Sequence, residues 1–296
     1  MDYRYKFTVF TPSYNRAGLL DRLYSSLKEQ TYKEFEWLIV DDGSTDNTQE
    51  VVESYQREGL LDIRYIKKEN GGKHTAVKLG VEKAQGELFL MIDSDDYFTP
   101  RGIEGFNREW ERIEDKENFS SVCCVCKDTN GEIIGSEFPE DIIDSNSMEI
   151  REKYGVTGDK AAFTKTEVYR KYPFPVFEGE RFITEAVVDD LVAMNYKTRF
   201  VNKVFCIKEY QVGGLSDNSL KLRINNPKGT IYYYNQSMRI SPTLKKQLRS
   251  AINYMRFSLH AGKGIVSALQ EAANKPVSLL GILPAVMMYH RDKKEL

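Results

Sequence analysis

The amino-acid sequence predicts an α/β fold with a doubly wound, mostly parallel sheet, followed by a helical and basic C-terminal part. Two observations carry this prediction. In the first hundred or so residues, short β-like runs alternate with helical stretches, a pattern typical of right-handed strand–helix–strand crossovers. Most of the β-like runs are almost continuously apolar, as expected for strands that helices cover on both faces.

The elements of this first part follow one another in a regular order. Four strands are expected, at Lys6–Phe10, Phe35–Val40, Ile63–Lys67 and Leu88–Ile92. Between the first two strands, one face of a helix is marked by Leu19, Leu20, Leu23 and Leu27. Asp46 and Gln49 have the spacing of an N-cap pair, and we expect the second helix to begin there. A third helix is expected around Thr75–Ala84.

The pattern becomes mixed after Pro100. We expect a helix near Ile103–Ile113, a strand at Ser121–Lys127, a loop-rich acidic segment around Gly135–Glu149, a helix at Glu185–Met194 and a strand near Val201–Ile207. Beyond Asp217 the chain is mainly helical, with helices at Thr243–His260 and Gly264–Ala273.

The segment Pro276–Tyr289 is almost wholly apolar, but it contains Pro284 and is too short to span a bilayer. It either packs on the body of the protein, which we favour, or lies in a membrane interface. The second interpretation rests on the basic residues that follow it, Arg291, Lys293 and Lys294.

Composition places the chain among ordinary globular proteins. Hydrophobic residues make up 41% and charged residues 29% of its 296 residues, which excludes a disordered, collagen-like or polytopic membrane protein. The N-terminus lacks the apolar core of a signal peptide, so we expect a cytoplasmic protein. We interpret the cysteines as buried thiols, because no second cysteine pair offers the spacing of a metal site; they are Cys123, Cys124, Cys126 and Cys206.

Charge is distributed unevenly along the chain. Residues 218–296 carry 13 Lys and Arg against 3 Asp and Glu, whereas residues 1–217 carry 29 against 41. This division has two equally good interpretations. The basic part faces an anionic surface, such as lipid headgroups, or it neutralises the acidic body within the molecule.

Polar clusters follow the four strands of the first part, at Thr11–Arg16, Asp41–Asp46, Asn70–His74 and Asp93–Asp96. In an open α/β sheet, ligands bind beyond the carboxyl ends of the strands. The last cluster places three carboxylates within four residues, and their mutual repulsion is costly unless a cation joins them. Hard oxygen ligands suit Mg²⁺ or Mn²⁺, which would bridge substrate phosphates and stabilise a diphosphate leaving group.

The clusters together resemble the motifs of family 2 glycosyltransferases, which have the GT-A fold. They read Thr-Pro-Ser-Tyr-Asn-Arg at 11–16, Asp-Asp-Gly-Ser-Thr-Asp at 41–46, Gly-Gly-Lys-His-x-Ala at 71–76 and Asp-Ser-Asp-Asp at 93–96. The match is firm over residues 5–100, looser over 101–217 and hardly present beyond. The resemblance implies a catalytic domain at 1–217, with a nucleotide-sugar-binding half (1–100) and an acceptor half (101–217), followed by a helical extension at 218–296.

The resemblance also implies roles for individual residues. The nucleotide pocket would be lined by Thr11, Pro12, Tyr14 and Arg16. Asp42 would accept a hydrogen bond from the imide N–H of the base, a geometry that favours uracil. Lys73 would approach the diphosphate, Asp93 would contact the ribose or the metal, and Asp95 would bind the metal directly. An ordinary surface charge at Arg16 and an exposed helix-start lysine at Lys73 are equally good interpretations.

An inverting transferase needs a carboxylate base on the acceptor side. The segment Gly179–Glu185 resembles the acidic acceptor-side motif of some family members, so Glu185 is our candidate base. The commoner adjacent Glu-Asp pair is missing, since Ala186 follows Glu185. Asp189 and Asp190 are therefore competing candidates, and a solvated acidic helix start is the alternative without a catalytic role.

The implied function is the metal-dependent, inverting transfer of a sugar from a nucleotide-sugar, expected to be a UDP-sugar. The cofactor would be Mn²⁺ or Mg²⁺, and the acceptor a saccharide or a lipid-linked precursor in surface polysaccharide synthesis. The basic residues 218–296 would allow peripheral contact with an anionic membrane, whereas nucleic acid is not an expected partner. Two alternatives are open: a phosphatase with an aspartyl nucleophile, and an inactive nucleotide-sugar-binding protein.

Overall fold

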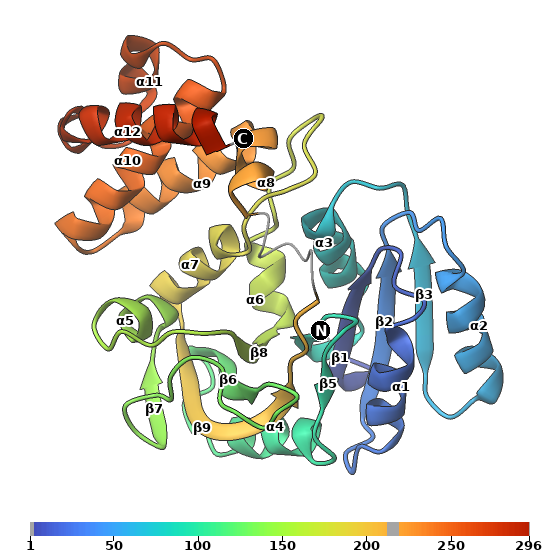
Figure 1. The fold of residues 1–296 in the computed structure, drawn as a ribbon. Coiled ribbons are helices and arrows are strands. Elements are labelled where there is room, and N and C mark those ends of the chain that lie inside the picture. The colour runs from blue at the N-terminus through green and yellow to red at the C-terminus, as the bar shows by residue number, and fades with distance from the viewer. Residues whose placement is uncertain (1–2, 212–218, 296) are drawn as a thin grey trace. The chain divides into compact units, whose positions relative to one another are not determined.

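The structure is a computed structural model that describes residues 3–211 and 219–295 (Figure 1). The chain forms two compact units. The first comprises Met1–Pro173 and Val188–Gln211, and the second comprises Phe174–Val187 and Val212–Leu296. The segment 174–187, which we expected in the acceptor half, therefore groups with the C-terminal helices. The domain division at residue 217 lies outside the described residues and stays a prediction.

The N-terminal half of the first unit contains the parallel part of its sheet. Its strands are β1 (Tyr5–Ser13), β2 (Phe35–Asp41), β3 (Ile63–Lys67) and β4 (Gly86–Met91). β1 pairs in parallel with both β2 and β4, and β2 pairs in parallel with β3. The four strands predicted for this part are confirmed.

The second half of the sheet is mixed. Its strands are β5 (Tyr97–Phe98), β6 (Phe119–Lys127), β7 (Ile142–Ser145), β8 (Lys160–Lys165) and β9 (Lys197–Ile207). β8 runs antiparallel to both of its neighbours, β4 and β6, while β9 runs parallel to β6. Within the described part of the chain, one nine-stranded sheet results, in the order β3-β2-β1-β4-β8-β6-β9-β5, with β7 paired to β9.

The loop-rich segment around Gly135–Glu149 also contains a short strand and the start of a helix, neither of which we predicted. It contains β7 and leads into the helix α5 (Ser147–Glu152). β7 forms because it pairs with β9, where Asp144 makes a two-pronged ion pair with Arg199 at 2.8 and 2.7 Å. These two residues lie 55 positions apart, so the pairing leaves no signal in the local sequence pattern.

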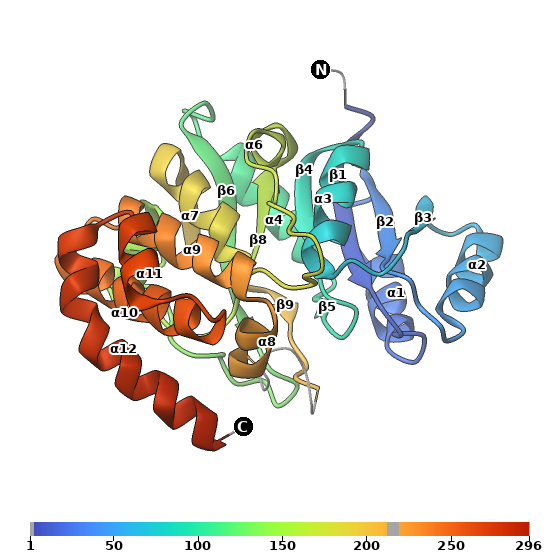
Figure 2. The same ribbon diagram turned by 90° about the horizontal axis from the view of Figure 1, so that it is seen from above.

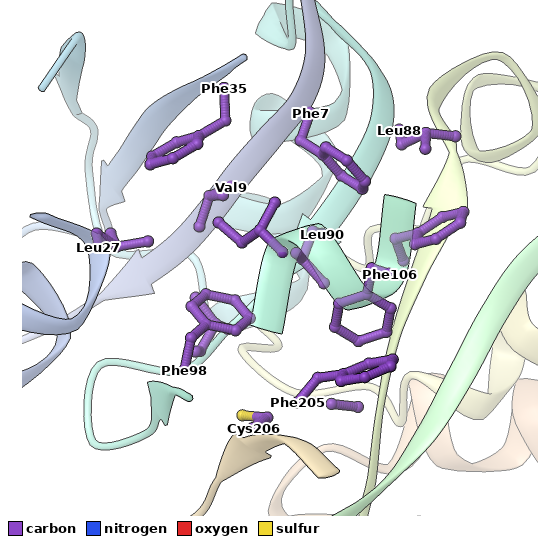
Figure 3. Close-up of a cluster of buried hydrophobic side chains, with 14 of the residues drawn as sticks. Phe7, Val9, Leu27, Phe35, Leu88, Leu90, Phe98, Phe106, Phe205 and Cys206 are labelled. Carbon is purple, nitrogen blue, oxygen red and sulfur yellow. The ribbon is translucent and has the colours of Figure 1, made fainter. Parts of the chain in front are cut away.

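Alternate residues of the parallel strands face opposite sides of the sheet, and helices cover both sides. On one side, Phe7 and Val9 pack with apolar residues of α1 (Leu20–Lys28), α2 (Thr48–Glu58) and α4 (Gly102–Glu111). Figure 3 shows part of this cluster. On the other side, the ring of Phe10 stacks on that of Phe89 at 4.9 Å, where α3 (Lys73–Lys83) covers β1 and α6 (Thr166–Lys171) covers β4.

The four cysteines are buried and free, as predicted. Cys124, Cys126 and Cys206 belong to the cluster that contains Phe7, and Cys206 is labelled in Figure 3. Free cysteine packs as a small hydrophobic residue, and these side chains do so here.

The second unit consists of helices and the segment 174–187. The helix α7 (Ala186–Asn195) begins in this segment and continues into the first unit. The others are α8 (Ser219–Asn225), α9 (Pro227–Ile240), α10 (Leu244–His260), α11 (Ile265–Glu271) and α12 (Lys275–Glu295).

The segment 174–187 joins the C-terminal helices because it caps one of them. The carboxylate of Glu180 accepts hydrogen bonds from the backbone N–H groups of Lys228 (2.6 Å) and Gly229 (2.8 Å), in the first turn of α9. A negative charge is favourable at this position, since the N-terminus of a helix carries a partial positive charge. The N–H of Arg181 donates in turn to Asn226 Oδ1 at 2.7 Å.

The core of the second unit is formed by buried residues of α9, α10, α11 and α12. Figure 2 shows these four helices beside one another. Helix α12 continues through Pro284, and its residues Val277 and Ala285 pack with Ala251 and Tyr254 of α10. Among the described helices, none combines the length and the apolarity that crossing a membrane would require.

A buried ion pair closes the C-terminal end of this helix pair. Asp292 of α12 has no exposed surface and accepts hydrogen bonds from Arg256, at 2.6 Å from its Nε, and from His260 Nε2, at 2.9 Å. Burial alone would raise the pKa of Asp292, but the hydrogen bonds from Arg256 and His260 outweigh it, and the pKa lies below its usual value.

We predict that Asp292→Asn destabilises the protein by about 3–5 kcal/mol, because the substitution leaves the buried guanidinium of Arg256 without its counter-charge. Urea unfolding at neutral pH measures this loss. The loss should shrink as the pH falls through the lowered pKa of Asp292, since the stabilisation is present only while the carboxylate is ionised. Glu271→Gln, which removes an exposed partner of Lys263, is the control and should cost less than about 1 kcal/mol. Equal losses in the two variants would contradict the prediction.

Candidate functional site

The parallel pairing brings the carboxyl ends of β1, β2, β3 and β4 to one edge of the sheet. The loops after these strands carry the four polar clusters noted in the sequence. Hydrogen bonds between neighbouring loops hold these clusters together. This edge of the first unit is the candidate site.

Asn15 fastens the loop after β1 to the loop after β2. Its backbone N–H donates to Ser44 Oγ, and its side-chain Oδ1 accepts from the N–H of Thr45, both at 2.8 Å. Its φ of 53° lies in the left-handed region, which few residues other than glycine adopt and asparagine tolerates best. The hydrogen bonds to the loop after β2 hold this backbone conformation. The conformation of Asn15 determines the direction of the backbone at its neighbours, Tyr14 and Arg16.

Asp46 belongs to the same junction and is not the N-cap that the sequence predicted. Helix α2 begins at Thr48, after Asn47 as N-cap. Asp46 Oδ1 accepts from the N–H (3.1 Å) and the hydroxyl (2.6 Å) of Thr48, while Oδ2 accepts from the N–H of Ala17 at 3.2 Å. The bond to Ala17 joins the loop after β1 to the loop after β2. The spacing between Asp46 and Gln49 contains no information about this contact, because Ala17 lies far away in the sequence.

Asp42 holds the loop after β3. Its Oδ1 accepts from Lys68 Nζ (2.6 Å) and from the N–H of Gly71 (3.0 Å), and its Oδ2 accepts from the N–H of Gly72 (2.7 Å). The residue is only 4% exposed. A carboxylate has about four acceptor positions, and these three hydrogen bonds use most of them. Asp42 therefore positions the start of α3 whether or not it also contacts a base.

Lys73, the first residue of α3, forms an ion pair with Asp93, with 2.8 Å between Nζ and Oδ1. Burial would raise the pKa of Asp93, but the positive charges of Lys73, Lys208 and Arg16 together lower it. Asp95 behaves oppositely: burial and the neighbouring charge of Asp93 raise its pKa, and Arg16 only partly offsets them. The surroundings of the two carboxylates thus shift their pKa values in opposite directions.

Lys208, which follows β9, belongs to the site, although no sequence pattern predicted it. Its Nζ lies 2.6 Å from Asp96 Oδ2, and the N–H of Glu209 donates to Asp96 Oδ1 at 3.2 Å. Burial raises the pKa of Asp96 to about 6, against the lowering effect of Lys208. No local signal marks Lys208 as a site residue, because β9 reaches this edge only through its pairing with β6 and β5.

The residues expected to line a nucleotide pocket differ in their surroundings. Thr11 is fully buried, and its Oγ1 accepts from the indole N–H of Trp37 at 3.0 Å, so its side chain faces the core. Pro12 and Arg16 are half-buried, and Tyr14 is exposed. The influence of Arg16 on the pKa values of Asp93 and Asp95 places its charge near both carboxylates.

The acceptor-side candidates are distributed over both units. Glu185 belongs to the second unit, whereas Asp189 and Asp190 belong to the first. Asp190 is 1% exposed and forms an ion pair with Arg151 at 2.9 Å, so its carboxylate already has a structural partner. Asp189 accepts a hydrogen bond from the hydroxyl of Tyr169 at 3.4 Å.

The Asp93–Asp96 turn fits a divalent cation that is bound jointly with a ligand. In residues 3–211 and 219–295, no group of three or more His, Cys, Asp and Glu side chains is placed to hold a metal by itself. Mg²⁺ and similar ions need not find such a group, because they commonly bind through one or two carboxylates, substrate phosphates and water. Burial and the neighbouring charge of Asp93 raise the pKa of Asp95, and a bound cation would offset both effects.

The chain belongs to the glycosyl transferase family 2, whose model matches residues 8–170. It is 31% identical over 145 residues, 48% of its length, to an uncharacterized glycosyltransferase of Rickettsia conorii, of which 23% is covered. It is 37% identical over 101 residues, 33% of its length, to the Staphylococcus aureus poly(ribitol-phosphate) beta-N-acetylglucosaminyltransferase TarS, of which 18% is covered. The matches thus span about a fifth of the length of these relatives. The family assignment removes the phosphatase alternative.

Two solved structures have the same fold. Residues 1–349 of S. aureus TarS in complex with UDP-GlcNAc give a TM-score of 0.62 at 17% identity, over 97% of this chain and 92% of that one. The mannosyltransferase PcManGT of Pyrobaculum calidifontis, in complex with GDP-Man and Mn²⁺, gives 0.57 at 19% identity, over 98% and 88%. The predicted GT-A fold is confirmed.

We predict that Asp96 makes the protein less stable as the pH rises toward neutrality. With a pKa of about 6 in the folded protein, Asp96 keeps a proton that the unfolded chain releases near pH 4. The free energy of unfolding, taken relative to that of Asp96→Asn, should therefore fall by about 2 kcal/mol between about pH 4.5 and about pH 6.5. Urea titrations of both proteins measure it, and parallel pH profiles would show that Asp96 titrates normally.

Proposed function

We propose that this chain is a metal-dependent, inverting glycosyltransferase that takes its sugar from a UDP-sugar. One observation carries the proposal: the residues that follow β2, β3 and β4 meet at one edge of the sheet. Lys73 forms an ion pair with Asp93 at 2.8 Å, and Asp42 holds Gly72, the residue before Lys73, at 2.7 Å. The family 2 membership supports transfer of a sugar. The names of TarS and of its complex with UDP-GlcNAc support a UDP-sugar as donor.

The nucleotide would bind against the loops after β1 and β2. The exposed ring of Tyr14 and the half-buried Pro12 would offer apolar surface to a base, and Asp42 would accept from its imide N–H. Thr11 would act through its packing, since its hydroxyl bonds to Trp37. The inter-loop bonds of Asn15 and Asp42 hold the loops that form this surface together.

The diphosphate would lie by the Asp93–Asp96 turn. Asp95, with Asp93, would hold Mn²⁺ or Mg²⁺ there, and the bound ion would supply positive charge to the departing diphosphate. The Mn²⁺ in the PcManGT complex supports this assignment. Lys73 and Arg16 would add charge from the protein, and Asp93 would orient Lys73 through their ion pair. The ion, Lys73 and Arg16 would thus stabilise the negative charge that grows on the diphosphate as its bond to the sugar breaks.

Transfer requires a base that removes a proton from the acceptor hydroxyl. We assign this role to Glu185, which would take the proton as the hydroxyl oxygen attacks the anomeric carbon from the face opposite the leaving diphosphate. Asp190, whose buried carboxylate forms an ion pair with Arg151, and Asp189 are the competing candidates. The acceptor would be a saccharide or a lipid-linked precursor of a surface polysaccharide. Contact of residues 218–296 with an anionic membrane would bring the enzyme to a lipid-linked acceptor.

We predict that Asp95→Ala lowers the rate of metal-dependent UDP release from a UDP-sugar by about 100-fold or more. The variant should fold normally and be as stable as the wild type or more so, because burial and Asp93 disfavour the charge of Asp95. Coupled-enzyme detection of UDP with and without Mn²⁺ measures the loss, and Asp141→Ala, an exposed carboxylate of the same unit, is the control. Metal-dependent release at the wild-type rate would refute the metal assignment.

We predict that Glu185→Gln lowers the rate of transfer by about 10²–10⁴-fold and leaves the affinity for UDP unchanged, since general-base assistance acts on the acceptor. Calorimetry gives the affinity, and product formation with saturating donor and acceptor gives the rate. Asp189→Asn is the matched comparison. If Asp189→Asn reduced transfer and Glu185→Gln did not, the base would be Asp189. Binding of UDP-sugar without turnover by the wild type would favour the inactive binding protein.

A further inference from the structure

Helix α12 presents an apolar face that nothing in the described chain covers. Its exposed side chains are Leu279 (59%), Leu280 (69%), Leu283 (70%) and Met287 (65%). They lie at helical spacing, opposite the buried positions Val277, Gly281 and Ala285, which face the core of the second unit. Val266 of the neighbouring α11 adds a further exposed apolar side chain (70%). Several exposed apolar side chains that gather on one face of a helix indicate an interaction surface.

Basic residues continue the same face toward the C-terminus. His290, Arg291 and Lys294 follow Met287 by three, four and seven residues, so they share its side of the helix, and all three are exposed. We call these three residues and the four apolar ones on α12 the outer face of α12. It is therefore apolar along its first turns and basic in its last two.

The sequence left two interpretations of the segment 276–289, packing on the body of the protein or lying in a membrane interface. Each interpretation fits one side of the helix. One side packs on α10, and the opposite side is exposed. Packing within the unit therefore does not account for the exposed leucines.

We propose that the outer face of α12 docks on the surface of an anionic lipid bilayer. The apolar side chains would enter the boundary between headgroups and acyl chains, while Arg291 and Lys294 would bind anionic headgroups. Charge selects this occupant. The second unit carries 14 Lys and Arg against 7 Asp and Glu, so an anionic surface attracts it and a second copy of the same unit is repelled.

Docking on a bilayer deepens the proposed function. It rests on that function in one respect, namely that a lipid-linked acceptor would lie at the same membrane surface. Docking requires neither bound metal nor turnover. A failure to bind vesicles would leave sugar transfer to a water-soluble saccharide unchanged, and a failure of transfer would leave vesicle binding unchanged. The two can thus be told apart.

Vesicle cosedimentation of the full chain tests the docking. We expect binding to phosphatidylcholine vesicles that contain about 30 mol% phosphatidylglycerol, and at least about tenfold weaker binding without the anionic lipid or at high salt. The double variant Leu280→Glu/Leu283→Glu should lose at least about tenfold in affinity. The matched control is Leu60→Glu, which makes the same change at a 62% exposed leucine of the first unit and should bind like the wild type.

Three outcomes would overturn the proposal. They are equal binding by the wild type and the double variant, equal binding to neutral and anionic vesicles, and a dimer in sedimentation velocity that the double variant dissociates without any vesicle binding by the wild type. The last outcome would make the outer face an interface between two copies of the chain.

A fluorescent reporter separates contact from an indirect effect of the glutamates on folding. Both native tryptophans, Trp37 and Trp110, are fully buried, so Met287→Trp introduces an indole whose emission reports on the outer face. With anionic vesicles its emission should shift to shorter wavelength and become protected from acrylamide. Leu60→Trp should show no shift. An unshifted spectrum of Met287→Trp, at lipid concentrations where the protein cosediments, would place the contact elsewhere and overturn the proposal.

Discussion

The first unit depends on the balance of charge at one edge of its sheet. The carboxylates of the Asp93–Asp96 turn meet cations from three distant parts of the chain, namely Arg16 after β1, Lys73 at the start of α3 and Lys208 after β9. Partly buried carboxylates at such close spacing are tolerated only with partners of opposite charge. Burial raises the pKa of the next two aspartates, Asp95 and Asp96, whereas Lys73, Lys208 and Arg16 lower the pKa of Asp93. A divalent cation would favour the ionised form of the partly buried Asp95, and this underlies its proposed role.

The sheet determines where this charge is placed. Strands that are buried on both faces fix the positions of their ends, and hydrogen bonds between the loops, centred on Asn15, Asp42 and Asp46, fix what lies beyond them. Asp42 illustrates how structure and proposed function share a residue. The carboxylate that suits a base also holds Lys68 and the glycines before α3, so a substitution there would disturb the positioning of Lys73 as well as any contact with the nucleotide.

The second unit uses similar interactions for a different purpose. Glu180 caps α9, and Asp292 joins α12 to α10 through Arg256. Both place a buried carboxylate against donors from elsewhere in the chain, and they fix the inner side of the helices. The outer face of α12 has no such partner within the described residues, although its leucines are as apolar as those of the core. That contrast between the two sides of one helix is the basis for proposing a bilayer as its partner.

The sequence by itself determined the parallel strands, most of the helices and the gathering of the four motifs. Apolar runs and helical spacing are local signals, and parallel strands necessarily end at the same edge. Only the tertiary structure decided that Lys208 joins the site, that β7 is a strand, that Asp46 binds Ala17 and that the hydroxyl of Thr11 faces Trp37. Each of these depends on groups brought within about 3 Å by strand pairing or loop packing. Such proximity follows from the course of the whole chain, so no local stretch of residues encodes it.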